Sequence, residues 1–232
     1  IPGASAGLGA EFARQLAAAG HNLILVARRE DRLNAIAGEL RAAHGVDCQL
    51  IIADLNESDA GAQISSACVA AGWRVSWLIN KAGVAGPDLL KDRDWAAQQT
   101  FFQLMMLSVA DLCHRMIPGM AERGYGRVIN VASVAARVPR SGGCNYGPAK
   151  AYLVALSEEL NLTVAAQGVH VSALCPGFTH TDFHETAGPL DSTNSMAKRP
   201  RHNADGGASG GRRGVEAGTQ AGGPASRARV ED

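Results

Sequence analysis

Gly3-Ala4-Ser5-Ala6-Gly7-Leu8-Gly9 is a glycine-rich stretch that leads directly into a helical pattern. That pattern runs over 7–19, carries Phe12 and Leu16 on one side, and stops at Gly20. Glycines with this spacing let a backbone approach a pyrophosphate and aim helix amides at it. We therefore predict a dinucleotide-binding turn. Its contacts are predicted at Gly3, Ser5, Gly7, Leu8 and Gly9.

Beyond this turn, short apolar runs alternate with helical patterns. The apolar runs lie at 23–26, 49–52, 77–79, 128–131 and 170–175, and they predict strands buried on both faces of a parallel sheet. Helical patterns separate them at 31–44, 58–71, 97–123 and 145–167. Repeated βα units predict an α/β fold with a doubly wound parallel sheet, the Rossmann fold, with ligands at the carboxyl ends of the strands.

The two ends of the chain depart from this pattern. Only Ile1 and Pro2 precede Gly3, so the first strand, which should come before a glycine turn, is missing. After about residue 190 an Arg/Gly/Ala-rich composition replaces the apolar runs, and the last strand is missing too. We predict a Rossmann catalytic domain over 1–190 and a disordered tail over 191–232.

Composition restricts the partners of the chain. The 22 Lys and Arg residues balance the 22 Asp and Glu residues, which excludes a chain built as a whole to coat nucleic acid or anionic lipid. No run approaches about 18 uninterrupted apolar residues, and no signal segment opens the chain, so we expect a cytoplasmic protein without membrane contacts. The five cysteines form no C-x-x-C pair, and we predict no metal site.

Two arginines indicate which cofactor binds. Arg28 and Arg29 end the first apolar run, at the position where an NAD-selective site places a carboxylate. Paired guanidinium groups suit a 2′-phosphate instead, so NADP is favoured over NAD. The alternative for these arginines is a solvated helix start. Asp54, at the end of the second run, is a candidate acceptor for the adenine amino group, or else a turn aspartate.

Three residues have the spacing of a proton-transfer site. Tyr146 follows Ser133 by thirteen positions, and Lys150 lies four positions beyond Tyr146 on the expected helix. An i, i+4 pair shares one helical face, so the lysine ammonium can lie beside the phenol. A free phenol has a pKa near ~10, and a neighbouring positive charge lets it donate and accept a proton at neutral pH. Tyr146 is therefore the candidate general acid and base.

Together these motifs resemble the short-chain dehydrogenase/reductase family. The resemblance rests on G-A-S-A-G-L-G at 3–9, Asp54-Leu55, N-K-A-G at 80–83, the stretch ending at Ser133, Y-G-P-A-K at 146–150 and P-G-F-T-H-T at 176–181. It implies hydride transfer between a nicotinamide and a carbonyl or alcohol carbon. By position it implies Ser133 to polarise the substrate oxygen, Tyr146 as proton donor, and Lys150 to lower the tyrosine pKa and hold the ribose. It implies cofactor contacts at Arg28, Arg29, Asp54, Leu55, Asn80, Ala82, Gly83, Tyr146, Lys150, Pro176, Gly177, Thr179 and Thr181.

Two departures from the family pattern support a second hypothesis. Met105 stands where the family has a catalytic asparagine, and Lys81 replaces the second asparagine of N-N-A-G, where it could perturb local packing. The alternative to an active reductase is therefore a weak or inactive cofactor-binding remnant or truncated fragment. The resemblance also implies a homodimer through the helices at 97–123 and 145–167, with a small carbonyl or alcohol compound as substrate.

Overall fold

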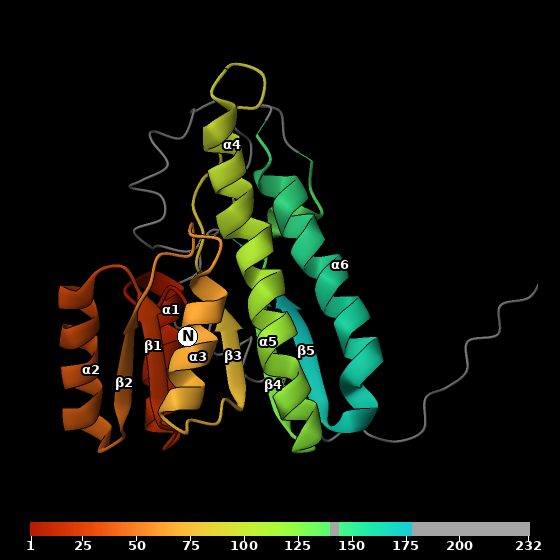
Figure 1. Ribbon diagram of the computed structural model, residues 1–232. Coiled ribbons are helices and arrows are strands. Elements are labelled where there is room, and N and C mark those ends of the chain that lie inside the picture. The colour runs from red at the N-terminus through yellow and green to blue at the C-terminus, as the bar shows by residue number, and fades with distance from the viewer. Residues whose placement is uncertain (140–143, 178–232) are drawn as a thin grey trace, which may run out of the picture.

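A computed structural model describes residues 1–139 and 144–177 of the chain (Figure 1). Strands and helices alternate along it. In chain order they are α1 (Gly7–Ala18), β1 (Leu23–Ala27), α2 (Glu30–His44), β2 (Cys48–Ile52), α3 (Ala60–Ala70), β3 (Trp77–Asn80), α4 (Trp95–Phe102), α5 (Ser108–Glu122), β4 (Gly126–Val131), α6 (Tyr146–Val164) and β5 (Val169–Leu174). The expected strands and helices are confirmed, with bounds that shift by a few residues. The segments predicted as a tail lie outside the described residues.

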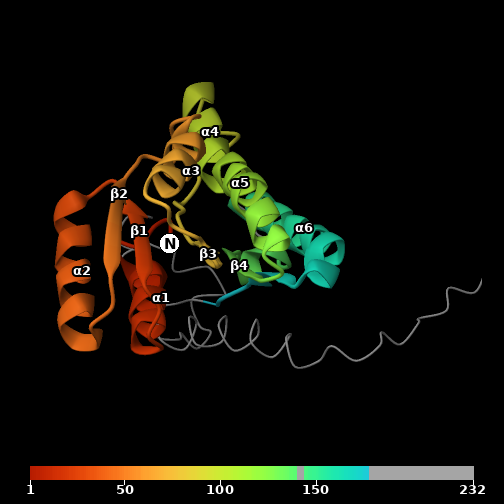
Figure 2. The same ribbon diagram turned by 60° about the horizontal axis from the view of Figure 1, so that its bottom comes forward.

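All strand pairs in the described residues are parallel, but they form two separate sheets. β1 pairs with β2, and β3, β4 and β5 form the second sheet in that order. Figures 1 and 2 show α3, α5 and α6 on one side of the strands, and α1 with α2 on the other side. The first helix or strand in the described part of the chain is α1.

Ile1 and Pro2 are the residues that lie between the two sheets. Pro2 forms a single parallel bridge with Val26 of β1, and the Ile1 carbonyl accepts from the Val26 amide at 3.1 Å. On the other side, the Lys81 amide donates to the Pro2 carbonyl at 3.3 Å. The two sheets are thus bridged only at their carboxyl ends by this segment of the described chain.

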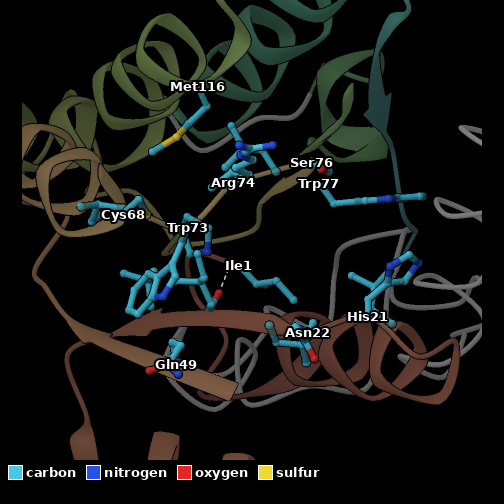
Figure 3. Close-up of a pocket in the computed structure, with 18 of the residues that line it drawn as sticks. Ile1, His21, Asn22, Gln49, Cys68, Trp73, Arg74, Ser76, Trp77 and Met116 are labelled. Carbon is cyan, nitrogen blue, oxygen red and sulfur yellow. Dashed lines mark hydrogen bonds between the residues drawn. The ribbon is translucent and has the colours of Figure 1, made fainter. Parts of the chain in front are cut away.

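A cavity of about 350 Å³ occupies the rest of the gap between β1 and β3 (Figure 3). Leu23 and Ile24 of β1 face Trp77 and Leu78 of β3 across it. Side chains of the covering helices close it, namely Leu16, Ile64, Cys68, Leu112 and Met116. The edges of two neighbouring strands therefore lack the ladder that a strand between them would form.

The α-amino group of Ile1 lies at the end of this cavity. It donates to the Ile24 carbonyl of β1 at 2.6 Å, and Figure 3 shows this bond as a dashed line. Burial lowers the pKa of the amino group to about 5, from an ordinary value of 8.0. A charged amine is therefore disfavoured at this site.

The long helical pattern expected over 97–123 begins earlier and is not uniform. α4 starts at Trp95, where the Asp94 carboxylate caps the helix by accepting from the Ala96 amide at 2.9 Å. A π-helical turn, Gln103–Leu107, joins α4 to α5. Such turns insert an extra residue into a helix and are frequent at functional sites, and they leave no periodicity signal in so short a stretch.

The cavity leads to a prediction about the free energy of unfolding. Attaching an extended segment of four or five β-branched apolar residues to the amino group of Ile1 should raise the free energy of unfolding by at least about 2 kcal/mol, because each buried side chain contributes about 1.5–3 kcal/mol. Urea unfolding followed by circular dichroism measures the change. A Gly-Ser extension of equal length is the matched control and should change little. Equal effects of the two extensions would contradict a strand-shaped cavity.

Candidate cofactor and active site

The glycine turn passes between the carboxyl ends of β1 and β3, and its backbone lies close to both. The Gly3 amide donates to the Val26 carbonyl at 2.9 Å, and Gly3 has a φ of +81°, which disfavours any other residue. A Cβ at Gly3 would lie 2.8 Å from the Ala82 amide nitrogen, and a Cβ at Gly9 would collide with the Gly3 carbonyl. Close approach of three backbone segments explains why the turn requires glycine.

The first turn of α1 offers amides to an anion. Ala6, just before the helix, has an extended backbone and caps no amide with its side chain, and no acidic residue lies in the first turn. The amides of Gly7, Leu8 and Gly9 have no partner of their own within an α-helix. Together with the positive end of the helix dipole, this arrangement fits a phosphate group.

A groove of about 160 Å³ runs from this turn across the carboxyl ends of β1, β2 and β3. It brings together eight of the predicted cofactor residues. These are Gly3, Ser5, Arg28, Arg29, Asp54, Leu55, Ala82 and Gly83. The groove has the glycines, the helix amides and the cations that a dinucleotide requires, so the residues present fit a nicotinamide cofactor.

The arginines that follow β1 are anchored at one end of the groove. Arg28 lies 3.6 Å from the Asp54 carboxylate, with 65% of its side chain exposed, and Arg29 donates to the Ser5 hydroxyl at 3.1 Å. Asp54 also accepts from the Asn56 amide at 3.0 Å, so it acts as a turn aspartate as well as lining the groove. Both guanidinium groups are therefore accessible beside the same rim.

Asn80 is turned into the sheet and away from the groove. Its amide nitrogen donates to the Asn130 side chain at 2.8 Å, and Asn130 in turn donates to the Ser157 hydroxyl at 2.9 Å. All three residues are buried. This network joins β3, β4 and α6, so Asn80 helps to position these elements. The predicted contact of Asn80 with the cofactor stays a prediction.

Tyr146 and Lys150 share one face at the start of α6. The Lys150 ammonium lies 5.7 Å from the centroid of the Tyr146 ring and donates to the Val131 carbonyl at 2.6 Å. Lys150 is 4% exposed. Burial, and to a lesser extent repulsion by the Lys81 ammonium, lowers the pKa of Lys150 to about 8 from 10.5. The i, i+4 prediction is thus matched by a close pair in space.

Ser133 comes from the end of β4, next to the start of α6. Its hydroxyl oxygen accepts from the Ala135 amide at 3.2 Å, which leaves the hydroxyl proton available to a substrate oxygen. A Cβ at Gly147 would lie 3.0 Å from the Ala135 carbonyl, so glycine after Tyr146 permits the close approach of α6 to this turn.

The Pro176-Gly177 segment is joined to the same turn, because the Val134 amide donates to the Pro176 carbonyl at 3.1 Å. These two predicted cofactor residues therefore lie beside the end of β4, where Ser133 begins the short helical turn Val134–Ala136. The other two residues predicted from the same motif, Thr179 and Thr181, lie outside the described residues.

Met105 occupies the π-helical turn beside Lys150. It is 1% exposed, and its sulfur accepts from the Val84 amide at 3.4 Å. Gly83 lies between the two side chains, since a Cβ there would be 3.1 Å from the Met105 sulfur and 3.8 Å from the Lys150 ammonium. Methionine thus fills this position by packing and a weak hydrogen bond.

Two contacts of the site were not anticipated. The Lys81 ammonium donates to the Ala6 carbonyl at 3.4 Å, and Lys81 lines the groove. Asn145, just before Tyr146, donates to the buried Gln98 of α4 at 3.3 Å. No local pattern identifies a pair so far apart in the chain.

Comparison with known proteins agrees with this geometry. The family model described as short chain dehydrogenase matches residues 1–190. The chain belongs to the short-chain dehydrogenase family. Sulfoacetaldehyde reductase 2 of Chromohalobacter salexigens is 32% identical over 79% of this chain and 73% of its own length. Serine 3-dehydrogenase of Agrobacterium fabrum is 32% identical over 85% of this chain and 79% of its own.

A solved structure of the same family shows the same fold. A short-chain dehydrogenase from Sphingobium yanoikuyae in complex with NADPH superposes with a TM-score of 0.83 and 30% identity, covering 94% of this chain and 84% of its own. The family assignment makes this chain an oxidoreductase of the Rossmann type. Among the described residues no helix is both long and apolar enough to cross a membrane.

The glycine turn yields a test by substitution. Gly9→Ala should lower the free energy of unfolding by about 1–3 kcal/mol or more, because the new methyl group meets the Gly3 carbonyl. Gly38→Ala in α2 is the matched control, since nothing lies within 4 Å of its Cβ position. The control should stabilise the protein by about 0.5–1 kcal/mol. Thermal unfolding compares the two, and a tolerated Gly9→Ala would contradict the close crossing.

Proposed function

We propose that the protein is an NADP(H)-dependent oxidoreductase that transfers a hydride between nicotinamide and a carbonyl or alcohol carbon. The observation that carries this proposal is the Tyr146 and Lys150 pair at the start of α6, with Ser133 on the adjoining turn. A small carbonyl or alcohol compound is the substrate class. When bound, the nicotinamide supplies or accepts the hydride, and the chain supplies the proton.

Each of the three side chains has a separate task. Tyr146 donates a proton to the substrate oxygen during reduction and removes it during oxidation. Lys150, 5.7 Å from the ring, lowers the free energy of the phenolate by its positive charge. Ser133 donates its hydroxyl proton to the substrate oxygen, because its oxygen already accepts from Ala135. The Val131 carbonyl holds the ammonium in place.

The charge of the groove supports NADP over NAD. Arg28 and Arg29 both line it, and Arg28 is mostly exposed. Two guanidinium groups can bind a 2′-phosphate through charge-assisted hydrogen bonds, and they offer no acceptor for a ribose 2′-hydroxyl. Asp54 is engaged with Arg28 and orients it.

Removal of the Tyr146 hydroxyl tests the proton-transfer role. Tyr146→Phe should lower kcat for ketone reduction by about 10²-fold to 10⁴-fold, the usual contribution of a positioned acid. NADPH oxidation with a panel of ketones measures kcat, and fluorescence titration should show NADPH affinity within about twofold of the unaltered chain. Retention of full kcat in the variant would refute the assigned role.

The same assay tests the second hypothesis, which is favoured by the presence of Met105 where the family has a catalytic asparagine. A cofactor-binding protein without turnover would bind NADPH, oxidise it with none of the ketones, and gain nothing from Met105→Asn. Turnover by the unaltered chain excludes that hypothesis.

Charge removal at the rim tests the cofactor preference. Arg28→Ala together with Arg29→Ala should weaken NADPH binding by at least about tenfold, since hydrogen bonds to charged groups contribute about 1.5–3 kcal/mol. NADH affinity should stay within about twofold. Fluorescence titration of both nucleotides measures the ratio. Equal losses for NADH and NADPH would show that these arginines do not recognise the 2′-phosphate.

We further propose a homodimer through the faces of α5 and α6, which lie side by side in Figures 1 and 2. Leu107, just before α5, and Leu162 of α6 are 55% and 85% exposed. Apolar side chains that are this exposed are suited to burial against a second copy.

A further inference from the structure

The position of Lys81 after β3 places its side chain in the cofactor groove. Side chains alternate between the two faces of an extended segment, so the inward turn of Asn80 sends Lys81 to the opposite side. The Lys81 amide is held by the Pro2 carbonyl at 3.3 Å, and its ammonium donates to the Ala6 carbonyl at 3.4 Å. Backbone and side chain are therefore both fixed against the glycine turn.

Ala6 is the residue directly before α1, where the uncapped amides of the first turn begin. The Lys81 side chain is therefore anchored next to the amides that would bind an anion. The positive end of the helix dipole raises the free energy of a cation at this position, and a bound anion reverses that effect. The location of Lys81 thus favours a ligand with negative charge at the glycine turn.

Lys81 is the lysine that lines the groove, together with Gly3, Ala6 and Gly83. Lys150 is engaged elsewhere, with the Val131 carbonyl and beside the Tyr146 ring. A negative group on the groove side of the glycine turn would therefore be attracted by Lys81. A diphosphate, with two negative charges, matches this position.

Lys81 and the arginines lie beside different parts of the groove. Arg28 and Arg29 are anchored at Asp54 and Ser5, whereas Lys81 is anchored at Ala6, at the start of α1. The arginines suit the 2′-phosphate of the adenosine ribose, and Lys81 suits the group that rests on the helix amides. Any effect of Lys81 should therefore depend on the diphosphate and be independent of the 2′-phosphate.

We propose that Lys81 binds the diphosphate of the nicotinamide dinucleotide, as a cation added to the glycine turn and the α1 amides. This inference rests on the proposed function, since it names a further binding residue of the same groove. It assigns to Lys81 a contribution to affinity that NADPH and NADH share.

Lys81→Gln in the full chain tests the proposal by equilibrium binding. NADPH and NADH are titrated by nicotinamide fluorescence, and ADP-ribose and adenosine 2′-phosphate by competition with NADPH. The first three ligands carry a diphosphate and should bind roughly 10- to 100-fold more weakly, the loss expected for one hydrogen bond to a charged group. Adenosine 2′-phosphate has no diphosphate, and its affinity should stay within about twofold.

Two further variants separate charge from packing. Lys81→Arg keeps the positive charge and should restore NADPH affinity to within about fivefold of the unaltered chain. Lys91→Gln removes a lysine whose side chain is 87% exposed and which does not line the groove, so it should leave every affinity unchanged.

The outcomes distinguish this inference from the proposed function. If the unaltered chain binds NADPH and Lys81→Gln binds it equally well, the role of Lys81 is overturned while the proposed function stands. Weaker binding of adenosine 2′-phosphate to the same extent as NADPH would also overturn it, because that pattern indicates general damage to the groove. If the unaltered chain binds neither NADPH nor NADH, the proposed function fails, and this inference with it.

Discussion

Hydrogen bonds of Pro2 and Gly3 with the strands on either side hold the two sheets together at their carboxyl ends. Gly3 donates to Val26 of β1, and Pro2 accepts from the Lys81 amide at the end of β3. These contacts join two sheets that are otherwise separated by a cavity in the described chain. They also set the carboxyl ends of β1 and β3 around the glycine turn, and the groove is formed there.

The opposite side of the site depends on a buried charge. Lys150 keeps its ammonium in the protein interior against the Val131 carbonyl, and the low solvent access lowers its pKa to about 8. Such burial costs stability, since desolvation disfavours the charged form. The Asn80, Asn130 and Ser157 network stiffens the strands and helix around it. The Val131 carbonyl thus holds Lys150 in place, at the end of the strand that also carries Asn130.

Met105 shows how a departure from a family pattern can be accommodated. Its sulfur satisfies the Val84 amide, and its side chain packs closely against Gly83. Met105 lies in a π-helical turn, so the helix is irregular at the position where this apolar side chain packs. Packing at this position is therefore satisfied.

Local periodicity and short spacing are sufficient to predict the order of strands and helices, the glycine turn and the Tyr146-Lys150 pair. The parallel pairing also follows from the alternation of βα units. The inward turn of Asn80, the contact of Lys81 with Ala6 and the support of Asn145 by Gln98 follow only from the packing of the whole fold. These contacts join residues that are distant in the chain, and their side-chain directions depend on strand register and on helix packing. Such relations are set by the assembled core and by no single stretch of sequence.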